Sequence, residues 1–322
     1  MNKHLYFTFV IREYLMRVVK KADIVKCWLK QGVLGMIELP EAIVFSKQIN
    51  ETLVGKKIRH VVKDQNPHRF AFPMKDTKQL GAEYSREDFD RILKGKTITK
   101  SWSNGNVILV QTGTDCLLSL GCGGEKIIYH ETEKTIPKKH QLLLVFEDDT
   151  FLSVTISGWG EVRLFKTENL GKHPHIGYDR IDPLSDEFTL EVFEKLIEEI
   201  PGNRKRNAKR FFISEPGLRG IGNGVIQDIF FLAKIHPRRE MSSLSKEERK
   251  LLYETTRIEL QKMVDLNGRN SEKDLFDNWG GYKRRLHSKA VNEPCPVCGT
   301  PIMKQQFGGG SIYFCPSCQK VE

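Results

Sequence analysis

Residues 295–318 read C-P-V-C-G-T-P-I-M-K-Q-Q-F-G-G-G-S-I-Y-F-C-P-S-C, and this stretch decides how the end of the chain folds. Its two C-x-x-C pairs are separated by 16 residues, a spacing that lets four thiolates converge on one tetrahedral metal ion. Because four thiolates leave no coordination position open to water, the spacing predicts a structural zinc and not a catalytic one. We therefore expect one Zn²⁺ held by Cys295, Cys298, Cys315 and Cys318. Zinc ribbons also occur in proteins unrelated to DNA, so the ribbon alone does not define the function.

The composition indicates a globular, basic protein. A chain of 322 residues with 39% apolar side chains can bury a sizeable core divided between two or three domains. Lysine and arginine outnumber aspartate and glutamate by 51 to 41, and the net charge of +10 with an isoelectric point near 9.1 suits a polyanion such as nucleic acid. Many soluble proteins are mildly basic, so charge alone leaves this open. No apolar run approaches the roughly 18 residues that span a bilayer, so we expect a cytoplasmic protein without membrane contact.

A second informative stretch, F-I-S-E-P-G-L-R-G-I-G-N-G, covers residues 212–224 immediately before an apolar helical run. Gly220 and Gly222 allow backbone amides to approach a ligand closely at the start of a helix, and Asn223 adds an amide donor, which together suit a phosphate. A tight corner between two helices would use the same residues without a ligand. The phosphate interpretation is favoured by the ribbon downstream and by the cations just upstream, Lys205, Arg206, Lys209 and Arg210.

Periodicity divides the rest of the chain into a strand-rich half and a helical half. The segment from Glu38 to Gly55 carries apolar residues at helical spacing and predicts an amphipathic helix. Short apolar runs between turn residues begin at residues 58, 97, 106, 116, 126, 140 and 151, and their spacing predicts a β-sandwich or barrel. Gly, His, Pro and Asp accumulate at 167–186 and indicate a linker. Helices are expected from Thr189, after the glycine-rich turn, and over 244–266.

The first 35 residues show no clean helical face and no targeting pattern. We expect residues 1–35 to be a non-native or mis-assigned extension, with the native chain starting at Met36; a genuine amphipathic extension is the alternative. The predicted domains are then a β-sandwich domain at 36–168, a helical domain at 169–287 and the four-cysteine finger at 288–322. A segment as short as the finger is expected to need its metal in order to fold.

Four motifs in a fixed order carry a resemblance to a known family. E-L-P-E stands at 38–41, D-P-L-S-D at 182–186, G-I-G-N at 220–223 with a following I-H-P, and the cysteine pairs close the chain. From Met36 to Glu322 the chain resembles the formamidopyrimidine-DNA glycosylase and endonuclease VIII family. The resemblance implies an α+β multi-domain fold. Its parts would be an N-terminal β-sandwich with flanking helices, a helical helix-two-turn-helix domain and a C-terminal zinc ribbon, with DNA held in the cleft between the halves.

The resemblance also implies a reaction, which is excision of oxidised bases followed by cleavage of the abasic strand. In the family an N-terminal proline amine attacks the sugar C1′, and the resulting Schiff base drives elimination of the flanking phosphates. Ile37 occupies the proline position, so the terminal amine would belong to Met36. Glu38 matches the family's proton-transferring glutamate and Glu41 a second acidic position, which makes Met36, Glu38 and Glu41 the candidate catalytic residues. Favourable acidic charge in a first helical turn is the alternative explanation of both glutamates.

The DNA-holding residues implied by the resemblance match better than the chemical ones. Lys209 and Asn223 fall on the family's phosphate contacts. Cys122 corresponds to the methionine that fills the vacated base site and Trp159 to the aromatic wedge, although Trp159 would also suit simple packing on the sandwich. Further cations of the DNA-facing wall would be Arg210, Arg219, His236 and Arg238.

Two cations of the family are absent, because Asn106 replaces a lysine in a strand turn and Gly310 replaces the arginine of the finger. Two functions therefore remain open. The first is a monomeric DNA glycosylase and abasic-site lyase that uses the Met36 amine or an internal lysine on damaged or abasic double-stranded DNA, at the nucleoid of a bacterial cytoplasm. The second is a catalytically degenerate binder of damaged or distorted DNA. A zinc-ribbon RNA-binding protein would require the E-L-P-E and G-I-G-N motifs to be coincidental.

Overall fold

A computed structural model of the protein describes residues 36–63, 84, 86–158, 160–176, 180–201 and 205–321. Residues 1–35 and Trp159, for which the sequence predicts an extension and a wedge, lie outside the described residues. The chain from Gly35 onward forms one unit. Within its described part, no helix is both long and apolar enough to cross a membrane.

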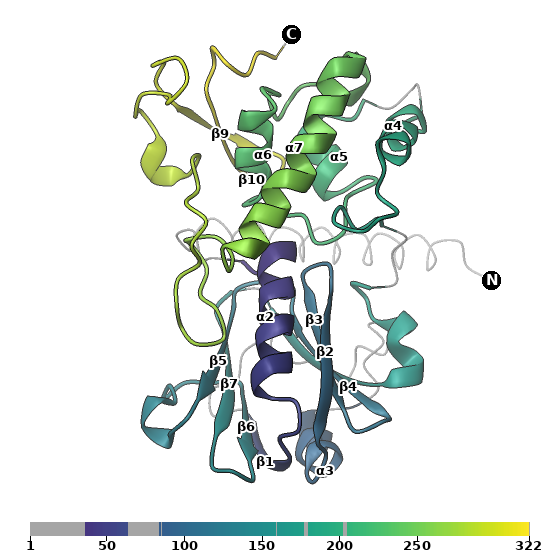
Figure 1. The fold of residues 1–322 in the computed structure, drawn as a ribbon, viewed down its shortest axis with the longest axis vertical. Coiled ribbons are helices and arrows are strands. Elements are labelled where there is room, and N and C mark those ends of the chain that lie inside the picture. Colours follow the sequence, from purple (N-terminus) through teal and green to yellow (C-terminus); the bar gives the residue numbers. More distant parts are fainter. Residues whose placement is uncertain are drawn as a thin grey trace, which may run out of the picture. The chain divides into compact units, whose positions relative to one another are not determined.

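Two antiparallel four-stranded sheets face each other in the N-terminal half (Figure 1). One sheet has the strand order β1-β6-β7-β5 and the other β2-β3-β4-β8. The strands are β1 (Ile58–Lys63), β2 (Ile98–Asn104), β3 (Val107–Thr112), β4 (Cys116–Gly121), β5 (Glu125–His130), β6 (Leu142–Phe146), β7 (Phe151–Ile156) and β8 (Glu161–Lys166). Seven of them coincide with the predicted apolar runs. The eighth, β8, was not expected because its charged residues interrupt the apolar ones.

The core of this sandwich consists of apolar side chains from both sheets, among them the fully buried Leu118, Leu144 and Leu164. The predicted amphipathic helix is confirmed as α2 (Leu39–Thr52), whose Phe45 and Ile49 belong to the same core. Because these two residues are four apart on one helical face, α2 packs along the sandwich. Shorter helical segments complete this half: α3 (Phe89–Leu93), η2 (Arg86–Asp88), η3 (Glu133–Thr135) and η4 (Thr167–Lys172).

The C-terminal half is helical and has an aromatic-rich core of its own. Thr189 begins the first helix as predicted, because its hydroxyl accepts a hydrogen bond from the Val192 amide at 3.3 Å. Ser245 and Glu248 form a reciprocal capping box at the start of the longest described helix. The helical segments are α4 (Leu190–Glu198), α5 (Ala208–Ile213), α6 (Ile226–Leu232), α7 (Lys246–Asp265), η5 (Met241–Ser243) and η6 (Ser288–Ala290). Their shared core includes Phe193, Phe211, Phe212 and Phe230.

The C-terminal finger is a two-stranded hairpin, β9 (Met303–Phe307) and β10 (Gly310–Phe314), flanked by the two cysteine pairs. It docks on α6, because the Tyr313 amide donates to Gln227 Oε1 at 3.0 Å and Phe231 packs against the finger's small apolar core. The predicted α+β architecture of sandwich, helical domain and ribbon is thereby confirmed.

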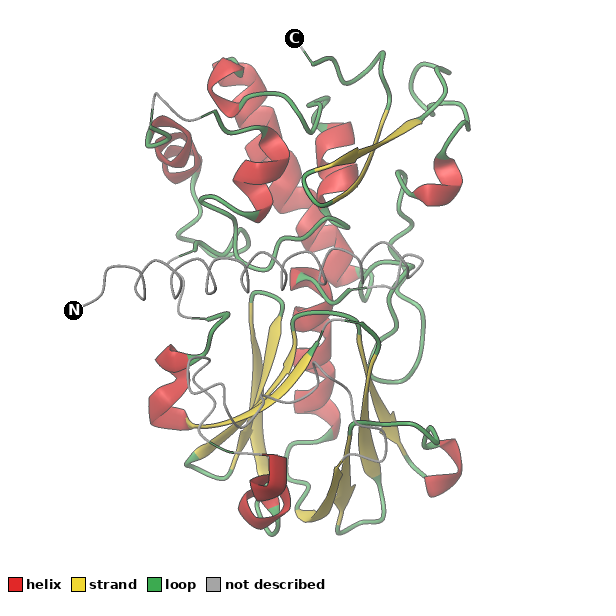
Figure 2. Cartoon of the chain, turned by 180° about the vertical axis from the view of Figure 1, so that it is seen from behind, coloured by secondary structure: helices red, strands yellow, loops and turns green. Residues whose placement is uncertain are grey.

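The segment between α7 and the finger binds the sandwich (Figure 2). Leu275 lies in the sandwich core, and its carbonyl accepts a hydrogen bond from the Tyr129 amide at 2.8 Å. Gln48 of α2 donates to Asp274 at 2.9 Å and accepts from the Leu275 amide at 3.0 Å. These contacts hold the helical half and the sandwich together at residues far apart in sequence.

Candidate DNA-binding and catalytic site

Glu38 lies at the N-terminus of α2 and reaches into the two-turn loop between α5 and α6. Its carboxylate accepts hydrogen bonds from the backbone amides of Gly222 at 3.1 Å, Gly224 at 2.8 Å and Val225 at 3.0 Å. A Cβ atom on Gly222 would lie 2.6 Å from Glu38 Cδ, so glycine is required there for space. The Gly222 amide, which the sequence assigns to a phosphate, is thus occupied by a carboxylate of the chain itself.

Glu41 and Arg269 complete this group, which we call the α2 junction (Glu38, Glu41 and Arg269). The Glu41 carboxylate accepts from Arg269 Nη2 at 2.7 Å, Nε at 2.9 Å and the Arg269 backbone amide at 3.0 Å. It also accepts from the Glu38 amide at 3.1 Å. Burial alone would lower the pKa of Arg269, but the two carboxylates raise it well above its usual value. Burial raises the pKa of the neighbouring Glu272 to about 7.

Ile37 stands where the family has its proline, and in this chain its nitrogen is part of an ordinary peptide bond. Ile37 is buried in the sandwich core, and its amide donates to the Gly123 carbonyl at 2.8 Å. The Met36 carbonyl accepts from Arg269 Nη2 at 2.8 Å. The Ile37 nitrogen is therefore a hydrogen-bonded amide and no nucleophile.

Lys209 and Asn223 meet at the turn of the finger, and we call this group the finger cluster (Lys209, Asn223 and residues 307–311). Lys209 Nζ donates to the Phe307 carbonyl at 2.6 Å, and Asn223 Nδ2 donates to the Ser311 carbonyl at 2.9 Å. Burial lowers the pKa of Lys209 to about 8. A Cβ atom on Gly310 would lie 3.5 Å from Lys209 Nζ, so a side chain at this position would point at the cluster. The structure therefore brings together the two predicted phosphate contacts and the position of the missing arginine.

The other residues predicted to face DNA differ in their surroundings. Arg210 is half exposed, and its Nη2 lies 3.1 Å from Glu215 Oε1. Arg238 stacks its guanidinium over the Phe307 ring at 5.3 Å. His236 is not the cation that the sequence suggests, because burial, together with nearby Arg238, lowers its pKa to about 4 and leaves the ring neutral at pH 7.

Two further predicted positions, Cys122 and Asn106, lie on the sandwich, and Arg219 of the two-turn loop reaches it. Cys122, predicted to fill the vacated base site, is 5% exposed and packs with Val107 and Leu109. Its φ of 78° is unusual for a residue other than glycine. Asn106 lies in the turn between β2 and β3, next to the two-turn loop: a Cβ atom on Gly220 would lie 2.7 Å from its backbone nitrogen. Arg219 Nη1 donates to Asn104 on the same turn.

Sequence reasoning missed Arg269 and the purpose of Gly224. Arg269 follows Asn267 and Gly268 in an irregular segment, and no spacing or motif marks it. The available signal was Gly224, a third glycine directly after G-I-G-N. Glycine disfavours helix, so a glycine just before a helical run calls for a reason. Only the tertiary fold shows that this glycine faces an arginine.

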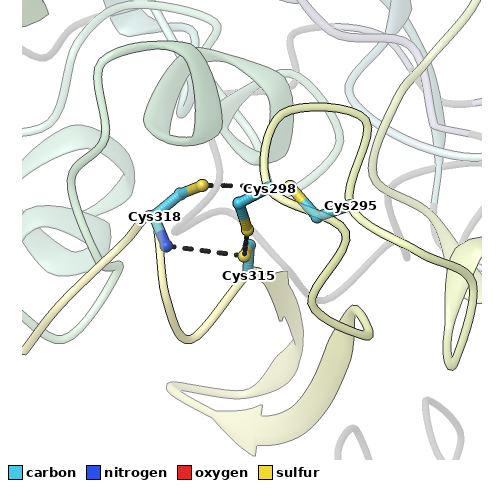
Figure 3. A group of neighbouring side chains, drawn as sticks. All are labelled: Cys295, Cys298, Cys315 and Cys318. Carbon is cyan, nitrogen blue, oxygen red and sulfur yellow. Dashed lines mark hydrogen bonds between the residues drawn. The ribbon is translucent and has the colours of Figure 1, made fainter.

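The four cysteines predicted to bind zinc converge in space (Figure 3). Their sulfur atoms all lie within 4.8 Å of one another, with Cys298 and Cys315 at 3.4 Å and Cys295 and Cys318 at 3.9 Å. Tetrahedral Zn–S bonds of about 2.3 Å would place the sulfurs about 3.8 Å apart. The donor set and its spacing therefore fit one zinc ion with a closed shell.

Three family models match this chain in order along its length. They are the formamidopyrimidine-DNA glycosylase N-terminal domain at residues 36–155, the H2TH domain of the same glycosylase at 180–274, and the zinc finger found in FPG and IleRS at 292–321. The last match, together with the cysteine cluster, bears out the prediction of one structural zinc.

Curated relatives and solved structures agree with these matches. Formamidopyrimidine-DNA glycosylase of Cytobacillus firmus is 26% identical over 289 residues, which cover 88% of this chain and 100% of that protein. The glycosylase of Listeria innocua is 29% identical over 299 residues, with the same coverage. A structure of Lactococcus lactis Fpg with abasic-site DNA has a TM-score of 0.71 at 24% identity, covers 88% of this chain and 99% of that one, and supports the fold. The chain therefore belongs to the formamidopyrimidine-DNA glycosylase family.

Proposed function

We propose that the protein is a DNA-repair enzyme of the glycosylase and abasic-site lyase type, which acts as a monomer on damaged, foremost abasic, double-stranded DNA. The observation that carries this proposal is the position of the two-turn loop. One side of the loop holds Glu38 through the Gly222 and Gly224 amides, and the other side places Asn223 against the finger. A candidate catalytic end and a candidate phosphate-binding cluster thus share one short segment. A cytoplasmic, nucleoid-associated location follows from such a substrate.

The proposed nucleophile is the α-amine of Met36 in a chain that starts there. The amine adds to the C1′ aldehyde of an abasic sugar, the carbonyl oxygen leaves as water, and an imine forms. Loss of a C2′ proton then breaks the bond between C3′ and its phosphate oxygen. Glu38 is placed next to this terminus and is the proposed proton carrier, which requires it to exchange one of its four present donors. The start at Met36 is supported by the family match, which begins at that residue.

The proposed domains remain a sandwich at 36–168, a helical domain at 169–287 and a finger at 288–322. Lys209 and Asn223 would hold phosphates in the second domain, with Arg210 adding charge near them. Cys122 and Trp159 would meet the vacated base site in the first domain. Residues 1–35 would be absent from the functional protein.

A second candidate, a catalytically degenerate binder of damaged DNA, is favoured by two observations. Ile37 replaces the family's proline and its nitrogen is a hydrogen-bonded amide. The Glu38 carboxylate accepts from Gly222, Gly224, Val225 and Arg269, and four donors saturate the lone pairs of a carboxylate. Such a protein would keep the finger cluster and have no reactive amine.

Borohydride trapping on a duplex with one abasic site separates these functions, because borohydride reduces an imine to a stable adduct. Three forms of the protein are compared: one that starts at Met1, one that starts at Met36, and one that carries a single glycine before Met36. We expect an adduct in the Met36 form alone, mapped by peptide mass to its α-amine, and strand cleavage that falls when Glu38→Gln is introduced.

The added-glycine form is the matched control, because its amine lies one residue away while the rest of the chain is unchanged. Tight abasic-site binding without an adduct in any form would establish the binder. Binding to abasic and intact duplexes with equal affinity and no adduct would contradict both functions.

A further inference from the structure

Arg269 connects the Met36 end of the chain to both glutamates of the α2 junction. Its side chain is 2% exposed. Nη2 donates to the Met36 carbonyl at 2.8 Å as well as to Glu41, and Nη1 donates to Glu38 Oε1 at 3.2 Å. One guanidinium thus contacts every residue assigned to the catalytic end.

The two-turn loop is shaped around this guanidinium. A Cβ atom on Gly224 would lie 1.7 Å from Arg269 Nη1 and 2.8 Å from Glu38 Oε1. The φ angle of Gly224 lies outside the left-handed region, so its backbone conformation alone does not demand glycine. Space for Arg269 is therefore the reason for glycine at 224.

We propose that Arg269 is a positioning residue that supplies the restraint lost with the family's proline. This inference rests on the proposed function, in which the Met36 amine is the nucleophile. A proline ring fixes its own φ, whereas Met36 has no such covalent restraint. Instead, the peptide group between Met36 and Ile37 is held on both sides: Arg269 donates to its oxygen, and its nitrogen donates to Gly123. The α-carbon that carries the amine is attached directly to this peptide.

The geometry requires an arginine and not merely a positive charge. A guanidinium presents several donors in a rigid plane, so it can hold a carbonyl and two carboxylates at once, whereas a lysine ammonium is a single point donor. A displacement of the terminus by about 1 Å can cost about 10²-fold in rate even when binding is unchanged. Arg269→Lys keeps the charge that the glutamates need and removes the planar arrangement.

The test uses the full chain from Met36 and single-turnover borohydride trapping at saturating abasic duplex. We expect Arg269→Lys to lower the trapping rate about 10²-fold, while the dissociation constant of the duplex changes less than about threefold. Arg285→Lys is the matched control, because Arg285 also faces two acids, Glu259 at 3.3 Å and Asp228 at 3.8 Å, within the helical domain. Its trapping rate should equal that of the unchanged protein.

Gly224→Ala provides a second route to the same displacement without removing a charge. The added methyl group occupies the space of Nη1, so we expect a similar loss of trapping rate. Because both substitutions act on one contact, the double variant Gly224→Ala with Arg269→Lys should be little slower than Arg269→Lys alone. Additive losses would contradict the steric coupling.

A readout without DNA separates this inference from the proposed function. The rate at which a small acylating reagent modifies the Met36 α-amine, mapped by peptide mass, should rise in Arg269→Lys and in Gly224→Ala but not in Arg285→Lys. An unchanged protein that traps no imine would overturn the lyase function, and the acylation rates would then decide the positioning role. Equal acylation rates in all four proteins, or an Arg269→Lys trapping rate equal to that of the unchanged protein, would overturn the positioning role.

Discussion

The α2 junction and the finger cluster lie on two sides of the same two-turn loop, yet they handle buried charge in opposite ways. In the junction, two carboxylates face one guanidinium, and each carboxylate accepts four hydrogen bonds. In the finger cluster, the Lys209 ammonium donates to a backbone carbonyl, and burial lowers its pKa to about 8. The α2 junction thus pairs its charges with opposite charges, whereas the finger cluster pairs the Lys209 charge with a neutral carbonyl.

This difference separates a structural role from a binding role. A group of charges that satisfies itself needs no ligand, and the removal of one member leaves an uncompensated buried charge. A buried cation held by one neutral acceptor is stabilised when an anion arrives. The comparison therefore supports the proposals that the finger cluster binds phosphate and that the junction positions the Met36 end of the chain.

The largest effect is expected when the junction is broken by Glu41→Gln. Arg269 then loses one of the two carboxylates that it contacts directly, and a neutral amide faces its buried charge. We expect the free energy of unfolding to fall by about 3 kcal/mol, measured by urea denaturation. Asp149→Asn, which removes the exposed pair of Asp149 with Arg59 at 2.7 Å, should cost less than about 1 kcal/mol. Equal losses of unfolding free energy in the two variants would show that the junction stabilises the fold no more than an exposed ion pair does.

A smaller effect is expected from titration of Lys209 in the finger cluster. Because its pKa is about 8 in the folded protein, affinity for an abasic duplex should fall above pH 8, by up to about tenfold per pH unit. Folding stability should rise over the same range, since the unfolded lysine still binds a proton up to about pH 10.4. Fluorescence anisotropy at fixed ionic strength measures the affinity. The pH dependence should flatten in Lys209→Arg, and its persistence there would exclude Lys209 as its origin.

The smallest effect sharpens the comparison by adding the missing cation. Gly310→Arg places a guanidinium beside the finger cluster, and the φ angle at 310 lies outside the left-handed region that favours glycine. We expect the slope of log affinity against log salt to steepen by about 0.9, as for one further phosphate contact. Met303→Arg adds the same charge to an exposed finger residue, 43% accessible, and should change the slope less. A larger change of this slope in Met303→Arg than in Gly310→Arg would contradict phosphate binding at the finger cluster.

Local patterns predicted the elements that depend on neighbouring residues. The apolar spacing after Glu38 predicted α2, the threonine at 189 predicted the start of α4, and the cysteine spacing predicted the zinc ligands. Each of these signals lies within a short stretch, so no long-range information was needed. The strand β8 and the helix α5 were not predicted, because charged residues interrupt the apolar pattern in both.

The sequence by itself determined the order of the domains, the zinc ribbon and the family resemblance, since motifs and periodicity are properties of the chain read in order. Only the tertiary structure decided what the motifs contact. It showed that the amides of Gly222, Gly224 and Val225 hold Glu38, and that Arg269 fills the space beside Gly224. Burial in the folded chain also lowers the pKa of His236 to about 4. Contacts between residues more than 180 positions apart, and the desolvation that shifts a pKa, arise only when the chain has folded.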